Sequence, residues 1–143
     1  MSLRFVDSFD NYISADLLEK WFESENHLNK DLLNVIAGAR KLGILCCLAT
    51  DQERYRAEYL KTVMFPDVFD RTFISSELGY QKRDPEFFSV VLNQLTHEIP
   101  PVTPSEVVYF DDSRANLDVA SRLGIIPVLY REVGQVRGIL GLD

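Results

Sequence analysis

The chain has 143 residues, of which 46% are hydrophobic, so it is long enough to form one globular domain with a buried core. Its net charge of -7 and pI of about 4.8, without a basic cluster, argue against a nucleic-acid or anionic-membrane partner, because such partners require neutralising Lys and Arg side chains. No apolar run approaches the roughly 18 residues that span a bilayer and no secretory leader pattern is present, so we expect a cytoplasmic protein.

From residue 30 onward, segments with helical periodicity alternate with short apolar runs typical of buried strands. Asn29 is available to cap the first helix, and Gly43 to end it. In order, we expect a helix at 30–41, a strand at 44–49, a helix from 51 to about 63, a strand at 72–75, a helix from 85, a strand at 107–110, a helix to 123 and a strand at 125–130. This alternation predicts the α/β class, a Rossmann-like doubly wound parallel sheet.

The first 29 residues do not follow this alternation. Residues 14–26 have the pattern of an amphipathic helix, with Leu17, Leu18, Trp21 and Phe22 on one face. We therefore divide the chain into an N-terminal segment at 1–29 and an α/β core at 30–143.

Polar side chains follow two of the predicted strands. Thr50 comes directly after the strand at 44–49, and Asp111 and Asp112 follow the strand at 107–110. Because ligands bind outside the carboxyl ends of parallel strands, we expect a hydroxyl and two carboxylates in one crevice. Together with Lys82, which lies between them in the sequence, they suit a phosphoryl group with a divalent metal.

Each of these residues also has a simpler interpretation. Thr50 and Glu53 have the spacing of a capping box, although a hydroxyl over a helix N-terminus is also placed to bind an anion. Lys82 alone would be read as a solvated loop lysine, because lysine is mostly exposed. One of the paired aspartates could cap the next helix while the other is solvated, and Ser113 is another candidate for that cap.

The order of threonine, lysine and aspartate pair resembles that of the haloacid dehalogenase-like (HAD-like) hydrolase superfamily, most of whose members are Mg²⁺-dependent phosphatases. The resemblance runs from about residue 29 to 130 and rests on the segments at 48–51, 76–85 and 110–116. A response-regulator receiver uses similar residue types, but its acidic pair comes first and its lysine last. The resemblance therefore implies a HAD-like core.

The resemblance also implies a function for each residue. The chain resembles a phosphohydrolase that acts on a small phosphorylated metabolite through an aspartyl-phosphate. Thr50, Asp51 and Lys82 would bind the phosphate, and Asp112 and Asp111 would bind Mg²⁺. Asp112 is the expected direct ligand because a small serine follows it, as in similar sequences, whereas Asp111 is expected to act through water.

The first motif of such families, Asp-x-Asp after an apolar strand, supplies the nucleophile, and this chain contains no Asp-x-Asp. The nearest candidates are Asp7 and Asp10, whose spacing on a strand would put the two carboxylates on opposite faces. In similar proteins, residues 14–29 correspond to the end of a helical cap inserted after this motif. We therefore expect that the first strand and most of the cap are missing, and that 1–29 is a cap remnant or an N-terminal extension.

In such folds the first strand lies at the centre of the sheet. Three outcomes are open here: Leu3–Val6 takes this position, the sheet closes up, or another chain donates a strand and causes self-association through the incomplete sheet. The alternative function is a truncated or degenerate non-catalytic HAD-like module that binds metal or phosphate, or associates with another chain.

Overall fold

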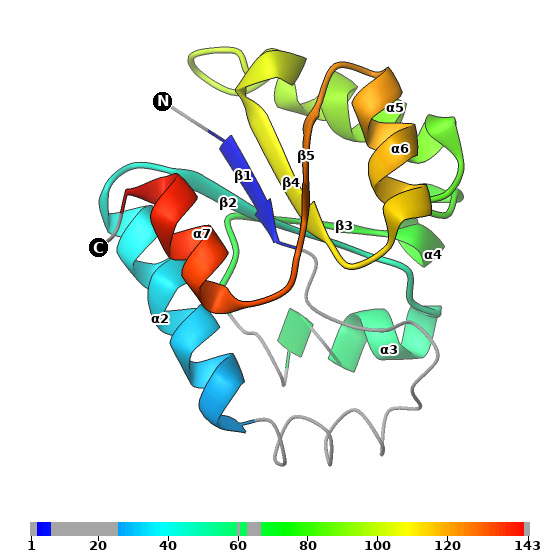
Figure 1. The fold of residues 1–143 in the computed structure, drawn as a ribbon. Coiled ribbons are helices and arrows are strands. Elements are labelled where there is room, and N and C mark those ends of the chain that lie inside the picture. Colours follow the sequence, from blue (N-terminus) through cyan, green and yellow to red (C-terminus); the bar gives the residue numbers. More distant parts are fainter. Residues whose placement is uncertain (1–2, 7–25, 60, 63–66, 142–143) are drawn as a thin grey trace.

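The computed structural model describes residues 3–6, 26–59, 61–62 and 67–141. Five parallel strands form one sheet in the order β3-β2-β1-β4-β5 (Figure 1). The strands are β1 (Leu3–Val6), β2 (Leu45–Thr50), β3 (Arg71–Ile74), β4 (Val107–Asp111) and β5 (Ile126–Leu129). The helices are α2 (Asn26–Lys41), α3 (Arg54–Tyr59), α4 (Ser75–Leu78), α5 (Pro85–Leu95), α6 (Arg114–Arg122) and α7 (Val133–Leu140), with a 3-10 turn η2 at Pro104–Glu106. The predicted doubly wound α/β class is confirmed.

β1 occupies the central position of the sheet. It pairs in parallel with β2 on one side and β4 on the other, so that Leu3 lies opposite both Leu45 and Val107. The first of the three open outcomes is therefore the one that the structure shows, and the expectation that the first strand is missing was wrong. From β1 the chain builds outward through β2 and β3 and then crosses to β4 and β5, which places the reversal of strand order at β1.

The segment at 1–29 thus contributes a strand to the sheet. Residues 7–25, which include most of the helix predicted at 14–26, lie outside the described residues. The division at residue 29 and the interpretation of the rest of this segment as a cap remnant stay predictions.

Helices cover both faces of the sheet, with α2 and α7 on one side and α5 and α6 on the other (Figure 1). Successive strand residues point to opposite faces, so Cys46 packs in the α2 and α7 cluster and Cys47 in the α5 and α6 cluster. Both cysteines are buried.

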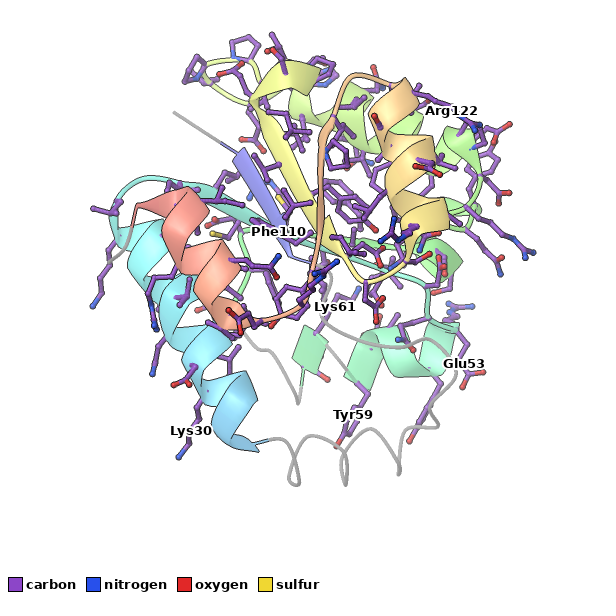
Figure 2. All side chains as sticks on the ribbon, in the orientation of Figure 1. Lys30, Glu53, Tyr59, Lys61, Phe110 and Arg122 are labelled. Atoms are coloured by element: carbon purple, nitrogen blue, oxygen red, sulfur yellow. The ribbon has the colours of Figure 1, made fainter. Side chains whose placement is uncertain are left out.

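Aromatic packing under α5 fixes the end of β4. The rings of Phe88 and Tyr109 are 4.9 Å apart and tilted by 59°, and Phe87 lies 5.0 Å from Phe88. Phe110 projects from β4 to the opposite face, toward α2 and α7 (Figure 2). Because strand side chains alternate, Asp111 projects on the same side as Tyr109.

Some element boundaries differ from the prediction. α2 begins at Asn26, so Asn29 lies inside the helix and the prediction that it is the N-cap was wrong. No proline or glycine interrupts residues 26–29, and asparagine inside a helix costs only a few tenths of a kcal/mol to about 0.7 kcal/mol. α3 covers only Arg54–Tyr59 of the helix predicted from 51 to about 63.

α7 was not predicted from the sequence. Val133 and Val136 are buried in this helix, in the cluster that also contains α2 residues. Tertiary packing of this kind supplies most helical stability and overrides the weak propensity of Gly134 and Gly138. In the described part of the chain, none of the helices combines the length and apolar character that crossing a membrane requires.

Candidate active site

Thr50 is the last residue of β2 and is completely buried. α3 begins only at Arg54, so Thr50 is not its N-cap and the capping-box interpretation was wrong. The Oγ1 atom of Thr50 instead accepts a hydrogen bond of 3.3 Å from Nε2 of Gln52. The Thr50 hydroxyl is therefore held at the carboxyl end of β2, where the sequence placed it.

Lys82 lies in the loop between α4 and α5 and is only 4% exposed, so it is not a solvated loop lysine. The loop turns at Gly79, whose φ of 84° is a left-handed conformation that favours glycine. The backbone N of Lys82 donates to Oδ1 of Asp51 at 2.9 Å, which ties the loop to the end of β2. Its Nζ donates to Oδ2 of Asp111 at 3.2 Å. Lys82 thus bridges the ends of β2 and β4.

Asp111 ends β4 and has both carboxylate oxygens engaged by the protein. Oδ1 accepts from the backbone N of Ser113 at 2.8 Å, and Oδ2 accepts from Lys82 Nζ and from Asn116 Nδ2, each at 3.2 Å. The Tyr109 hydroxyl also donates to Oδ2. Burial by itself raises the pKa of Asp111, but the Lys82 ammonium and the other donors outweigh it and leave the pKa below its ordinary value.

Asp112 has a different environment. Its residue surface is exposed to solvent, but its carboxyl group is partly desolvated by its surroundings. This desolvation, together with the neighbouring Asp111 carboxylate, raises the pKa of Asp112 despite the opposing charge of Lys82. Ser113, and not an aspartate, is the N-cap of α6, with its Oγ accepting from Asn116 N at 3.3 Å. The simpler interpretation of the pair, in which one aspartate caps the helix, was therefore wrong.

The structure brings Thr50, Asp51, Lys82 and Asp111 to one end of the sheet, on either side of β1. Sequence reasoning did not identify Gln52, Tyr109 and Asn116 as members of this site. The two candidate nucleophiles, Asp7 and Asp10, lie outside the described residues. Asp7 is the residue that follows Val6, the end of the central strand, in the sequence.

A cavity of about 500 Å³ lies beside this group, and sequence reasoning gave no signal for it. It is lined by residues 51–53, 75–76, 79–81 and Asp84, which include the carboxylates of Asp51, Glu53 and Asp84. Its walls come from the loop that follows β2, from the start of α4 and from the loop between α4 and α5, so it adjoins the end of the sheet that carries Thr50.

The carboxylates at the ends of β2 and β4 are the possible ligands for a metal ion at this site. Within the described ranges, His, Cys, Asp and Glu side chains form no group of three or more that could hold a metal. Mg²⁺ prefers oxygen ligands, keeps several waters and commonly takes only one or two protein carboxylates. Since protein donors occupy both oxygens of Asp111, Asp112 is the carboxylate of the pair that is open to an ion. The residues present fit Mg²⁺ on this chemistry.

The sequence of the chain matches a known protein family. A sequence model of the family described as haloacid dehalogenase-like hydrolase matches residues 7–124. The chain is also 27% identical over 110 residues to bifunctional epoxide hydrolase 2 of Rattus norvegicus, a match that covers 73% of this chain and 19% of that protein. The chain therefore spans about a fifth of this curated relative.

Solved structures share the fold. A HAD phosphatase from Thermococcus onnurineus matches with a TM-score of 0.64 and 20% identity, over 87% of this chain and 64% of that one. A HAD family enzyme from Bacteroides thetaiotaomicron, solved as an aspartate-to-alanine mutant with magnesium and inorganic phosphate, matches with a TM-score of 0.58 and 24% identity. That match covers 70% of this chain and 52% of the enzyme.

Proposed function

Because the chain belongs to the haloacid dehalogenase-like hydrolase family, we propose that it is a Mg²⁺-dependent phosphohydrolase that acts on a small phosphorylated metabolite through an aspartyl-phosphate. The observation that carries this proposal is the buried pair of Lys82 and Asp111, which lies with Thr50 at the carboxyl ends of β4 and β2. A buried ammonium with a fixed carboxylate partner is a preorganised site for the charge of a transferring phosphoryl group.

Thr50 and Lys82 would contact the phosphoryl oxygens. The Thr50 hydroxyl donates a hydrogen bond, and the Lys82 ammonium neutralises charge as it develops on the oxygens. Asp111 holds the ammonium in place through the 3.2 Å contact, and Asp51 holds the loop that carries Lys82. These contacts fix the Lys82 ammonium and its loop before a substrate arrives, so little reorganisation of this group is needed during the reaction.

Asp112 would hold Mg²⁺ directly, and Asp111 would act on the ion through water. When bound, the metal ion neutralises phosphoryl charge as a Lewis acid. The fit of the donor set supports this assignment, and so does the fold-level similarity to an enzyme solved with magnesium and inorganic phosphate. Within the described ranges Asp112 forms no salt bridge, which fits the raised pKa of its carboxyl.

Asp7 is our first candidate for the nucleophile, and Asp10 is the second. In similar proteins the nucleophile directly follows the central strand of the sheet. β1 takes this central position here, and Asp7 is the next residue in the sequence. Its carboxylate would attack phosphorus while the bond to the leaving-group oxygen breaks, and that oxygen would take a proton from water. Water would then hydrolyse the aspartyl-phosphate and release inorganic phosphate.

The test is Mg²⁺-dependent hydrolysis of p-nitrophenyl phosphate by the full chain. We expect Asp7→Asn and Asp112→Asn each to lower kcat at least about 100-fold. Asp118→Asn, an exposed position on α6, is the matched control and should keep full activity. Undiminished turnover in Asp7→Asn would eliminate Asp7 as the nucleophile, and undiminished turnover in Asp112→Asn would remove the metal assignment.

A second function is favoured by one observation, the absence of Asp-x-Asp from the sequence. In this second function the chain is a truncated or degenerate HAD-like module. Such a module binds metal or phosphate without turning a substrate over, or associates with another chain. Calorimetric binding of inorganic phosphate with no hydrolysis in the wild type would support this module. Turnover that disappears in Asp7→Asn would exclude it.

A further inference from the structure

Gln52 is a polar residue in the loop between β2 and α3, yet only 4% of its surface is exposed. Glutamine is mostly exposed in proteins, and a buried amide is costly unless its polar atoms are bonded. The burial of Gln52 two residues after Thr50 therefore requires a compensating set of contacts.

The backbone of Gln52 is fixed by Ser75, the first residue of α4. The backbone N of Gln52 donates to Oγ of Ser75 at 2.9 Å, and the same hydroxyl donates back to the carbonyl O of Gln52 at 3.3 Å. Two bonds in opposite directions hold the loop after β2 against the start of α4. The position of the Gln52 backbone is thus set by contacts within the fold.

The side chain of Gln52 turns back to Thr50. Its Nε2 donates to Thr50 Oγ1 at 3.3 Å, and both residues are buried. Its Oε1 is buried without a hydrogen-bond partner among the described residues. The amide therefore presents its donor, and not its acceptor, to the threonine.

The direction of this bond decides what the threonine hydroxyl can do. A hydroxyl has one hydrogen and two acceptor lone pairs. With one lone pair occupied by Nε2, the hydroxyl hydrogen of Thr50 is not used in the bond to Gln52 and stays available for a phosphoryl oxygen. An acceptor at the same place would take that hydrogen instead.

We propose that Gln52 is a positioning residue, which orients the Thr50 hydroxyl so that its hydrogen is donated to the phosphoryl group. This inference rests on the proposed function of Thr50. Residues 50–52 would then act together. Thr50 contacts the phosphoryl group, Asp51 holds the Lys82 loop, and Gln52 fixes the orientation of the Thr50 hydroxyl.

The test is the affinity of the full chain for inorganic phosphate, measured by calorimetry at saturating Mg²⁺. Gln52→Met removes the donor without adding charge, and we expect it to weaken phosphate binding about tenfold. Gln52→Glu offers only acceptors at neutral pH and should weaken binding further. Each variant is first checked by thermal unfolding, so that loss of fold is not mistaken for loss of orientation.

The control is the same change in a Thr50→Val background, where no hydroxyl remains to be oriented. There Gln52→Met should have no further effect, whereas a merely structural role would give the same loss in both backgrounds. Equal losses in the two backgrounds, or wild-type affinity in Gln52→Met, would overturn the inference while leaving the proposed function intact. A wild-type chain that binds no phosphate would instead remove the proposed function, and this inference with it.

Discussion

Lys82 and Asp111 form an ion pair in which Nζ and Oδ2 are 3.2 Å apart and the side chains are only 5% and 0% exposed. Removing both charges from water costs several kcal/mol per ion, and their attraction repays this only with good geometry and further hydrogen bonds. Asp111 has such bonds from Tyr109, Ser113 and Asn116. The pair therefore indicates a preorganised site more than a source of stability.

The two residues should be energetically coupled. We expect Lys82→Met to lower the free energy of unfolding by about 3 kcal/mol, because it leaves the Asp111 carboxylate buried without its cation. In the double variant with Asp111→Asn, the combined loss should be smaller than the sum of the single losses by at least about 1 kcal/mol. Urea denaturation of the four proteins gives both quantities, and strictly additive losses would contradict the coupling.

Asp111 should also make the stability of the protein depend on pH. Burial by itself raises its pKa, but Lys82 and the hydrogen-bond donors lower it more, so the folded pKa lies below the unfolded value of about 3.9. The contribution of Asp111 is then fully present well above about pH 4 and is lost as the pH falls through the folded pKa. As the pH is lowered from about 6 to about 3, the free energy of unfolding should decrease less steeply in Asp111→Asn than in the wild type. Asp118→Asn, with its exposed position, should keep the wild-type slope.

Asp112 should have the opposite effect. Partial burial and the Asp111 carboxylate raise its folded pKa, so at neutral pH its ionised form destabilises the folded chain. In metal-free buffer we expect Asp112→Asn to raise the Tm by about 1 to 3 °C. Added Mg²⁺ should raise the Tm of the wild type but not of the variant. A variant that keeps the full Mg²⁺-induced rise would show that the ion binds elsewhere.

Part of the site was predictable because it depends on local patterns. The apolar runs place Thr50 and Asp111 at strand ends, and the structure confirms those positions. Lys82 could be selected only through its place between the other two motifs, because nothing in its local sequence reveals that it will be buried against a distant aspartate. The roles assigned to these residues stay predictions.

The unpredicted parts depend on contacts between distant segments. Tyr109 looks like an ordinary core residue in the sequence. Its hydrogen bond to Asp111 can be expected from strand alternation only once it is known that β4 packs against α5. α7 is weakened locally by two glycines and is stabilised by packing against α2. Glu132 and Gln135 form a capping box at its N-terminus, but a glutamate at the N-cap does not match the usual sequence signature, which begins with serine or threonine.

The central position of β1 gives the last prediction. Phe5 lies opposite both Cys47 and Tyr109, so its backbone belongs to the middle of the sheet. Phe5→Pro removes an N–H from the middle of the sheet and should lower the free energy of unfolding by about 1 to 3 kcal/mol, whereas Phe5→Ala keeps the backbone donor. If β1 detaches in the proline variant, the edges of β2 and β4 become open to another chain, and we expect larger species in size-exclusion chromatography with light scattering. The alanine variant should elute like the wild type, and identical elution and stability of both variants would show that β1 pairing is not needed to close the sheet.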